Sequence, residues 1–324
     1  MRTDAPLATR RCLPDTAPVQ PTLAQLTDQL VESYSKLGGI NHVDGKNLPS
    51  KLAVAAITTD LLCLLFPGFF EEQLQHSSAL RANTETLLNS VRSALEAEVT
   101  KALEYNPPAG LAKKDIRTTA HASALQFLGR LPGVRDLLQT DIEAAYNGDP
   151  AALSREEVIV AYPFVECIAV QRMAHELYLK EVPLIPRIMT EWAHSRTGMD
   201  LHPGARIGTH FFVDHGTGTV IGETTEIGDH VKMYQGVGLV ARSLSAGQQL
   251  RGKKRHPTLE DRVTIYAGAT IVGGETVVGA DSTIGASVFL THSVPPHSLV
   301  VQEDPNVKIL SKKDRENFAP DWQI

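Results

Sequence analysis

The chain has 324 residues, 42% of them hydrophobic and 21% charged, which is normal for a globular protein with one large domain or two ordinary ones. Its 31 lysines and arginines against 37 aspartates and glutamates give a net charge of −6, which argues against nucleic-acid or anionic-membrane partners, since both need a basic surface. Three widely spaced cysteines form neither a disulfide framework nor a metal cluster and favour a reducing compartment, so a cytoplasmic location is expected.

No stretch of the sequence is long and apolar enough to cross a bilayer, and no membrane partner is expected. The most apolar run, residues 61–66, is followed directly by Pro67 and Gly68, far short of the roughly 20 residues that a membrane helix requires. The first 20 residues contain arginines but no apolar core. They are therefore expected to form a disordered lead and not a secretory signal.

Residues 21–197 are expected to form a helical domain. Apolar residues spaced three and four positions apart predict amphipathic helices over 22–37, 80–105, 115–129 and 134–146. Prolines at positions 163, 183 and 186 should divide the region from 155 to 196 into several short helices. The apolar stripe of the longest predicted helix is formed by Leu87, Leu88, Val91, Leu95, Val99 and Leu103.

From Gly198 the helical pattern gives way to a six-residue repeat that continues to about residue 300. In several repeats glycine directly follows the aliphatic residue, as in Ile207-Gly208 and Ile284-Gly285. This period indicates a parallel β-helix, a coil of short strands in which one aliphatic side chain per strand points inward and a small residue turns the corner. An ordinary β-sandwich needs no such sustained repeat. The aliphatic positions are Leu201, Ile207, Val213, Ile221, Ile227, Met233, Leu239, Leu259, Ile265, Ile271, Val278, Ile284 and Leu290.

A polar segment at 240–257 interrupts the repeat and must leave the solenoid as a loop between two coils. Such loops often carry function. The predicted organisation is therefore a lead at 1–20, a helical domain at 21–197, a β-helix at 198–300 with the inserted loop, and a C-terminal tail at 301–324.

His215 lies within the repeats but out of step with the aliphatic positions, and Gly216 follows it. An imidazole suits general-base chemistry near neutral pH, and it needs an acceptor that orients its other nitrogen. The nearby acids are Asp214 and Asp200. On spacing alone, a structural role for His215 remains the alternative.

Residues 200–223 (DLHPGARIGTHFFVDHGTGTVIGE) resemble the signature of the serine O-acetyltransferases, members of the hexapeptide-repeat acyltransferase family. The resemblance continues in residues 254–257 (KRHP), 267–269 (AGA) and 294–297 (VPPH). Residues 148–150 (GDP) are similar to the segment of the family's helical domain that contacts serine. The fold class that the resemblance implies is α + β, with an N-terminal all-helical domain followed by a left-handed parallel β-helix of hexapeptide repeats.

The resemblance implies that the chain transfers the acetyl group of acetyl-CoA to the hydroxyl of L-serine, giving O-acetylserine for cysteine biosynthesis. His215 would be the general base that takes the proton of the serine hydroxyl. Asp200, on a neighbouring coil, would hold the imidazole in its tautomer. Asp149 and Asp214 would receive the serine ammonium.

The resemblance also assigns the rest of the substrate site. Arg255 would bind the serine carboxylate, for which a planar guanidinium is suited, with His256 beside it. Acetyl-CoA would lie in a groove between adjacent subunits, against Ala267 and Gly268. The site would need no metal, and cysteine would compete with serine for it.

The resemblance further implies partners. The β-helix domains of the family form trimers, and a dimer of trimers is the alternative. Family members often end in isoleucine, which inserts into the active site of O-acetylserine sulfhydrylase, and Ile324 would dock in the same way.

Two segments depart from the family pattern. Residues 239–243 (LVARS) stand where many members have Leu-Gly-Gly-Thr-Gly, and residues 303–308 (EDPNVK) replace the usual Gly-Val-Pro-Ala-Arg. The inserted loop is also longer. These departures bear on the CoA contacts more than on the serine chemistry.

Three other functions remain as alternatives. The acceptor could be another amino acid or a sugar. A zinc carbonic anhydrase also occurs on this kind of β-helix, and His210 and His215 have the spacing H-x₄-H, but a third ligand is missing at a convincing position. A scaffold that uses the β-helix only for assembly is disfavoured by the joint presence of His215, Arg255 and His256.

Overall fold

The structure, a computed structural model, describes residues 20–71, 75–243, 245 and 247–303. Most of the predicted lead, and the tail beyond Glu303 with Ile324, lie outside the described residues. The chain divides into two compact units, residues 1–46 and 47–324. The first unit contains α1 (Leu23–Lys36), which begins with a capping box formed by Thr22 and Gln25 and has no buried residue.

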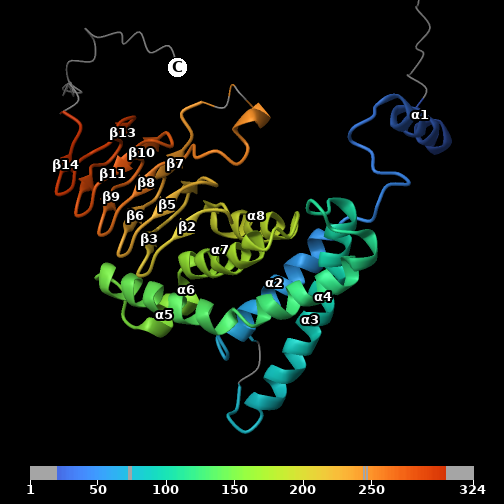
Figure 1. Cartoon of the computed structure of the whole chain (residues 1–324), viewed down its shortest axis with the longest axis horizontal. Helices are drawn as coiled ribbons and strands as arrows, with labels where there is room; N and C mark the ends of the chain where they lie inside the picture. The colour runs from blue at the N-terminus through green and yellow to red at the C-terminus, as the bar shows by residue number, and fades with distance from the viewer. Residues whose placement is uncertain (1–19, 72–74, 244, 246, 304–324) are drawn as a thin grey trace, which may run out of the picture. The chain divides into compact units, whose positions relative to one another are not determined.

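Within the second unit, the helices come first and are followed by short strands in the described residues (Figure 1). The helix predicted at 80–105 is confirmed as α3, and the proline-divided region forms three separate helices. One helix, α2, has no counterpart among the predicted ones, because its own sequence is apolar on most sides and shows no amphipathic stripe. The helices are α2 (Lys51–Leu65), α3 (Leu80–Tyr105), α4 (Ile116–Leu128), α5 (Leu131–Gly148), α6 (Arg155–Ala161), α7 (Pro163–Leu179) and α8 (Ile185–Thr197).

The strands pair only in parallel and form three sheets in the described residues, which we number as the three faces of a prism. Sheet 1 contains β1 (Asp200–Leu201), β4 (Val220–Ile221), β7 (Gly238–Val240), β10 (Thr270–Val272) and β13 (Phe289–Leu290). Sheet 2 contains β2 (Arg206–Ile207), β5 (Glu226–Ile227), β8 (Thr258–Leu259) and β11 (Val277–Val278). Sheet 3 contains β3 (Phe212–Asp214), β6 (Lys232–Tyr234), β9 (Thr264–Ile265), β12 (Thr283–Ile284) and β14 (Leu299–Val300).

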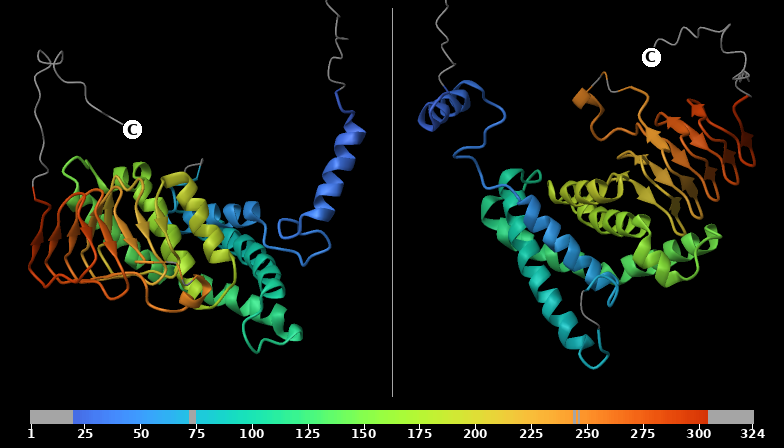
Figure 2. Two further views of the ribbon diagram at one scale, coloured as in Figure 1. Left: turned by 90° about the horizontal axis from the view of Figure 1, so that it is seen from above. Right: turned by 180° about the vertical axis from the view of Figure 1, so that it is seen from behind.

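Successive coils stack on one another (Figures 1 and 2). The pairing of their strands places repeated aliphatic residues in columns. In sheet 1, Leu201 pairs with Ile221, Ile221 with Leu239, Leu239 with Ile271, and Ile271 with Leu290. All five side chains are buried. The predicted fold class, helices followed by a parallel β-helix, is thereby confirmed. The inserted loop leaves the prism between β7 and β8 and contains a 3₁₀ turn at Gly247–Leu250.

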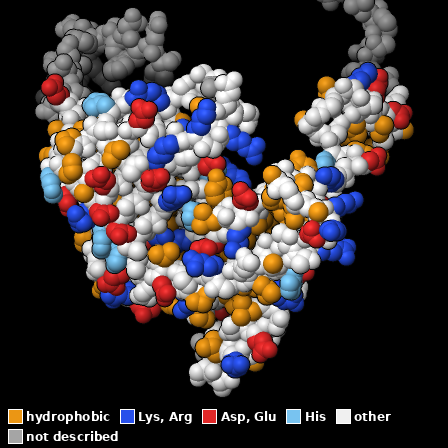
Figure 3. All heavy atoms as spheres, viewed as in Figure 1, with side chains coloured by type: hydrophobic (Ala, Val, Ile, Leu, Met, Phe, Trp, Pro, Cys, Tyr) orange, Lys and Arg blue, Asp and Glu red, His pale blue; other side chains and the backbone are white. Residues whose placement is uncertain are grey.

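The prism has three edges, which we name by the sheets that they join. The chain turns from sheet 1 to sheet 2 at the 1–2 edge, from sheet 2 to sheet 3 at the 2–3 edge, and from sheet 3 back to sheet 1 at the 3–1 edge. Acidic and basic side chains are interspersed on the face that Figure 3 shows, consistent with the near balance of charges. The described helices include none with both the length and the apolar character that a membrane span requires.

Helices α5, α7 and α8 pack against the first coil, and a buried ion pair between α5 and α7 bonds to the same coil. The Arg172 guanidinium of α7 donates to both oxygens of Asp141 on α5, at 2.6 and 2.8 Å, and the two side chains are 4% and 1% exposed. Arg172 also donates to the carbonyls of Ile207 and Gly208, and Asp141 accepts from the N–H of Phe211. The pair therefore satisfies backbone groups at the first 2–3 turn.

Replacing Arg172 by methionine should lower the free energy of unfolding by about 3–5 kcal/mol, because the Asp141 carboxylate and the two carbonyls would be left buried without a donor. Urea unfolding measures this loss. The matched control is Arg130→Met, which removes an ion pair with Glu176 at 3.0 Å whose arginine side chain is 61% exposed. Its unfolding midpoint should stay close to that of the unaltered protein. Equal shifts for the two variants would contradict the anchoring role of the buried pair.

Candidate active site

His215 occupies the 3–1 edge at the turn between β3 and β4. Its backbone is left-handed, with φ of 60°, and Gly216 follows at 77°. A Cβ at position 216 would lie 2.3 Å from the Met199 sulfur, so only glycine fits beneath the histidine. The imidazole is 71% exposed, and its Nδ1 lies 3.7 Å from Oδ1 of Asp214. The turn thus presents an accessible imidazole next to a carboxylate.

Asp149 is brought to the same edge by the end of α5. A Cβ at Gly148 would lie 2.9 Å from the ring of Phe212 on β3, and Lys232 of β6 donates to the Gly148 carbonyl at 2.6 Å. The Asp149 carboxylate accepts from the Tyr162 hydroxyl at 2.5 Å and from the N–H of Ala151 at 2.8 Å.

Hydrogen bonds and nearby cations keep Asp149 ionised. The Tyr162 hydroxyl lowers the pKa of Asp149 most, followed by the Ala151 N–H and the charges of Lys232 and His215. The same hydrogen bond raises the pKa of Tyr162 to about 12, with a smaller contribution from Asp214. The 3–1 edge therefore gathers Asp149, Asp214 and His215 in one chain.

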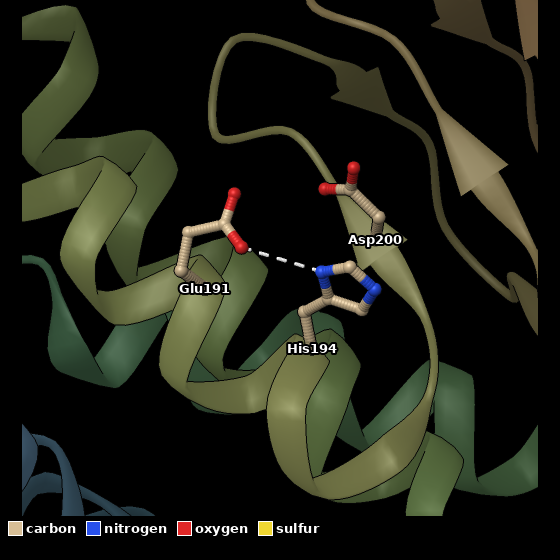
Figure 4. A group of neighbouring side chains, drawn as sticks. All are labelled: Glu191, His194 and Asp200. Atoms are coloured by element: carbon tan, nitrogen blue, oxygen red, sulfur yellow. Dashed lines mark hydrogen bonds and ion pairs between the residues drawn. The ribbon is translucent and has the colours of Figure 1, made fainter. Parts of the chain in front are cut away.

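Asp200 lies on β1, one coil before β4, with its carboxylate beside α8 (Figure 4). Its Oδ1 is 3.6 Å from Arg187, which also pairs with Glu191 at 2.5 Å. Glu191 in turn contacts His194 at 3.3 Å. Among the described residues no hydrogen bond or ion pair joins Asp200 to His215. Because Arg187 already pairs with both carboxylates of the cluster in Figure 4, we interpret the cluster as an ion-pair network and not as a metal site.

Arg255 and His256 lie at the 1–2 edge, where the inserted loop returns to the prism. Arg255 pairs with Glu223, and Glu223 also accepts from the Tyr178 hydroxyl of α7 at 2.8 Å. Burial opposes ionisation of Glu223, but these two hydrogen bonds hold its pKa below the usual range. Thr224 accepts from the backbone N–H of both Arg255 and His256, at 2.9 and 3.0 Å. The turn thereby fixes both residues.

His256 is buried and has a defined tautomer. Its Nδ1 lies 3.1 Å from the N–H of Thr224, which can only donate, so Nδ1 is the acceptor and Nε2 carries the proton. Burial, with the nearby charge of Arg255, lowers the pKa of His256 to about 4. His256 is therefore a neutral donor at neutral pH. A Cβ at Gly222 would lie 2.0 Å from the His256 ring, so the ring packs directly on that glycine.

The residues predicted for the site therefore form two groups on different edges of one chain. His215, Asp214 and Asp149 lie at the 3–1 edge, and Arg255 and His256 at the 1–2 edge. The strand between these edges, from Thr219 to Gly222, is roughly 13 Å long at the usual rise per residue. Ala267 and Gly268 lie at the 3–1 edge two coils beyond His215, since Asp214 pairs with Tyr234 and Lys232 with Thr264.

The histidine pair considered for zinc is not brought together. His210 lies at the 2–3 edge and His215 at the 3–1 edge, at opposite ends of β3 and roughly 15 Å apart along an extended chain. His210 instead stacks on His230 of the next coil, with ring centroids 4.1 Å apart.

Sequence reasoning missed the residues that hold the predicted ones in place. Glu223 lies inside the matched segment but received no role, and Tyr162 and Tyr178 gave no signal because a tyrosine near a helix end is common. Glu223 and Tyr178 also line a cavity of about 630 Å³ with His202, Arg187 and Arg251.

Two histidines with lowered pKa values, the buried His256 and the partly buried His202, predict a pH dependence of the free energy of unfolding. Burial lowers the pKa of His202 and of His256 to about 4, so the unfolded chain binds protons below about pH 6.5 that the folded chain does not. The free energy of unfolding should therefore fall as the pH drops from 6.5 towards 4. In urea titrations His202→Gln should weaken this fall, and His292→Gln, at an exposed position, should not. An unchanged slope in His202→Gln would rule out a neutral buried imidazole.

Comparison with known proteins places this geometry in a family, although no family model matches the chain. Over 269 residues the chain is 43% identical to the plasmid serine acetyltransferase of Synechococcus elongatus, covering 79% of this chain and 82% of that protein. Serine acetyltransferase isoform 3 of Entamoeba histolytica, solved with cysteine, has a TM-score of 0.69 and 31% identity, covering 90% of this chain and 96% of that one.

A serine acetyltransferase of Brucella abortus, solved with coenzyme A, has a TM-score of 0.50 and 27% identity, covering 78% of this chain and 93% of that one. The similarity to the Synechococcus protein extends over most of both chains, through the helices as well as the β-helix. The chain belongs to the serine acetyltransferase family.

Proposed function

We propose that the chain transfers the acetyl group of acetyl-CoA to the hydroxyl of L-serine, with His215 as the general base. The observation that carries this proposal is the exposed imidazole of His215 held beside Asp214 and Asp149 at one edge of the prism. An accessible base flanked by two carboxylates suits an acceptor that carries both a hydroxyl and an ammonium group. The products are O-acetylserine and CoA, which would feed cysteine biosynthesis.

The reaction moves one proton from the serine hydroxyl to His215 and then from His215 to the CoA sulfur. The neutral His215 imidazole takes the serine hydroxyl proton as the oxygen attacks the thioester carbonyl carbon. The tetrahedral intermediate then collapses, the carbon–sulfur bond breaks, and the imidazolium returns the proton to the CoA sulfur. A positioned base of this kind contributes about 10²–10⁴-fold.

A carboxylate on Nδ1 would fix the tautomer of His215 and stabilise the imidazolium. Asp214 lies 3.7 Å from that nitrogen. The proposed role of Asp200 requires its carboxylate to turn from Arg187 towards His215, because its ion pair here is with Arg187.

The serine-binding residues support a site shared between copies. Asp149 and Asp214 would bind the ammonium, and Arg255 with the Nε2–H of His256 the carboxylate. Serine is far smaller than the face of the prism that separates these groups, so one chain cannot supply both. We infer that the 3–1 edge of one copy meets the 1–2 edge of the next. A head-to-tail interface forms a ring when its rotation closes, and the ring that we propose is the trimer implied by the resemblance to the family.

The remaining partners follow from the same arrangement. Acetyl-CoA would lie along the 3–1 edge past Ala267 and Gly268, as the family member with coenzyme A supports. Cysteine has the ammonium and carboxylate of serine and would compete at Asp149, Asp214 and Arg255. The cytoplasm is the proposed location, because Cys63 and Cys167 are both free thiols. Docking of Ile324 into O-acetylserine sulfhydrylase also stays a proposal.

Replacing His215 by asparagine should lower serine-dependent CoA release by about 10²–10⁴-fold with the fold intact, because the base is lost from an exposed position. Asparagine is chosen since it tolerates the left-handed backbone. The control is His230→Asn, which has a φ of 59° and lies at the 2–3 edge. It should keep the activity of the unaltered enzyme. Full activity of His215→Asn would refute the assignment of the base.

Mixing two inactive variants tests the shared site. His215→Asn and Arg255→Ala copies should each be inactive alone. If each site takes His215 from one copy and Arg255 from the next, every mixed trimer has one intact site of three, so mixed trimers should show about one third of the unaltered activity. Co-expression with two affinity tags and purification through both allows the measurement. No recovery from verified mixed assemblies would show that each site lies within one chain.

A further inference from the structure

Helix α7 connects the two halves of the proposed serine site (Figures 1 and 2). Tyr162 immediately precedes its first residue, and Tyr178 is its penultimate residue. Each hydroxyl donates to a carboxylate, Tyr162 to Asp149 and Tyr178 to Glu223. We propose that these two tyrosines are positioning residues for serine, Tyr162 for the ammonium and Tyr178, through Glu223, for the carboxylate. This inference rests on the proposed function and names the residues that tune substrate binding.

At the 3–1 edge, Tyr162 fixes the orientation of Asp149. One carboxylate oxygen accepts from the N–H of Ala151 and the other from Tyr162, so rotation of the side chain would break a hydrogen bond. A carboxylate has about four acceptor sites, which leaves two for an ammonium group. The charges nearby are Lys232 on β6 with His215 and Asp214 at the end of β3.

At the 1–2 edge, Tyr178 fixes Arg255 through Glu223. Glu223 receives the hydroxyl on one oxygen and the guanidinium on the other, and its side chain is 22% exposed. Arg255 has five N–H donors in a fixed fork, so this contact holds the guanidinium and leaves donors for a substrate carboxylate. Without the Tyr178 hydroxyl, the Glu223 carboxylate would be held by Arg255 alone. Both side chains would then be less ordered.

Contacts in the middle of helix α7 fix the positions of the tyrosines at its two ends. Its middle carries Arg172, which is bonded to Asp141 and to the first coil, and Gln171, which donates to the Ala205 carbonyl at 3.0 Å. The helix is about 25 Å long, so its ends reach different edges of the prism. In the proposed trimer, the tyrosines of one α7 would serve two different sites.

The test is the steady-state kinetics of Tyr162→Phe and Tyr178→Phe. Phenylalanine keeps the packing of the ring and removes only the hydroxyl. Each variant should raise the KM for serine about tenfold, with kcat and the KM for acetyl-CoA within about twofold, because the lost contact orders substrate-binding groups and not the base. The double variant should raise the KM for serine by the product of the two factors, since the hydroxyls act on different groups.

Competitive inhibitors that carry one group each distinguish the two roles. Ethanolamine keeps the ammonium and lacks the carboxylate, and 3-hydroxypropanoate has the reverse, each used at concentrations that inhibit the unaltered enzyme. Tyr162→Phe should weaken inhibition by ethanolamine, and Tyr178→Phe inhibition by 3-hydroxypropanoate. The control is Tyr146→Phe on α5, whose hydroxyl has no hydrogen bond among the described residues and whose ring stacks under Arg155. Tyr146→Phe should leave the inhibition constants of both ethanolamine and 3-hydroxypropanoate unchanged.

The outcomes separate the inference from the function on which it rests. If the unaltered protein releases no CoA with serine and acetyl-CoA, the proposed function is wrong. If it does, and both tyrosine variants keep the KM for serine, the positioning role is refuted. A fall in kcat alone, with the KM for serine unchanged, would likewise overturn it, because that would place the tyrosines in the chemical step.

Discussion

The buried pair of Arg172 and Asp141 is the constraint from which the rest of the structure follows. The first coil of a solenoid has no preceding coil to pair with, so its turns expose unpaired backbone groups. Arg172 donates to the carbonyls of Ile207 and Gly208, and Asp141 accepts from the N–H of Phe211 in the same turn. Since each later coil stacks in register on the one before, this contact also fixes where the turn that carries His215 lies relative to α5.

Under the proposed function, the three-sided prism requires that the serine site be formed by neighbouring copies of the chain. A narrow aliphatic core leaves no interior space for a ligand, so the functional side chains lie at the turns. The turn with His215 and the turn with Glu223 are separated by a whole face of the prism. Two groups that must hold one small amino acid can meet only when edges of neighbouring chains meet. Assembly is thus part of the proposed chemistry.

Much of this arrangement could be predicted from sequence, for physical reasons that also explain the failures. The six-residue repeat predicts the coils because inward positions tolerate only aliphatic residues, as the column from Leu201 to Leu290 shows. Helix α2 was missed because its sequence is apolar on most sides and shows no amphipathic stripe. Tyr162 and Glu223 were missed as site residues because their roles depend on contacts between distant segments. The direction of the Asp200 carboxylate likewise depends on its ion pair with Arg187, which the sequence pattern does not predict.

The histidines illustrate how environment and not residue type assigns a role. His256 is buried with its Nδ1 on a backbone N–H, and its pKa falls to about 4, which suits a neutral donor and excludes a base near neutral pH. His202 is held in the same way by the N–H of Gly204. His215 is mostly exposed, stands beside a carboxylate and has no backbone donor on its ring among the described residues. Of these three imidazoles, it alone is mostly exposed and lies beside a carboxylate, which suits the proposed role of general base.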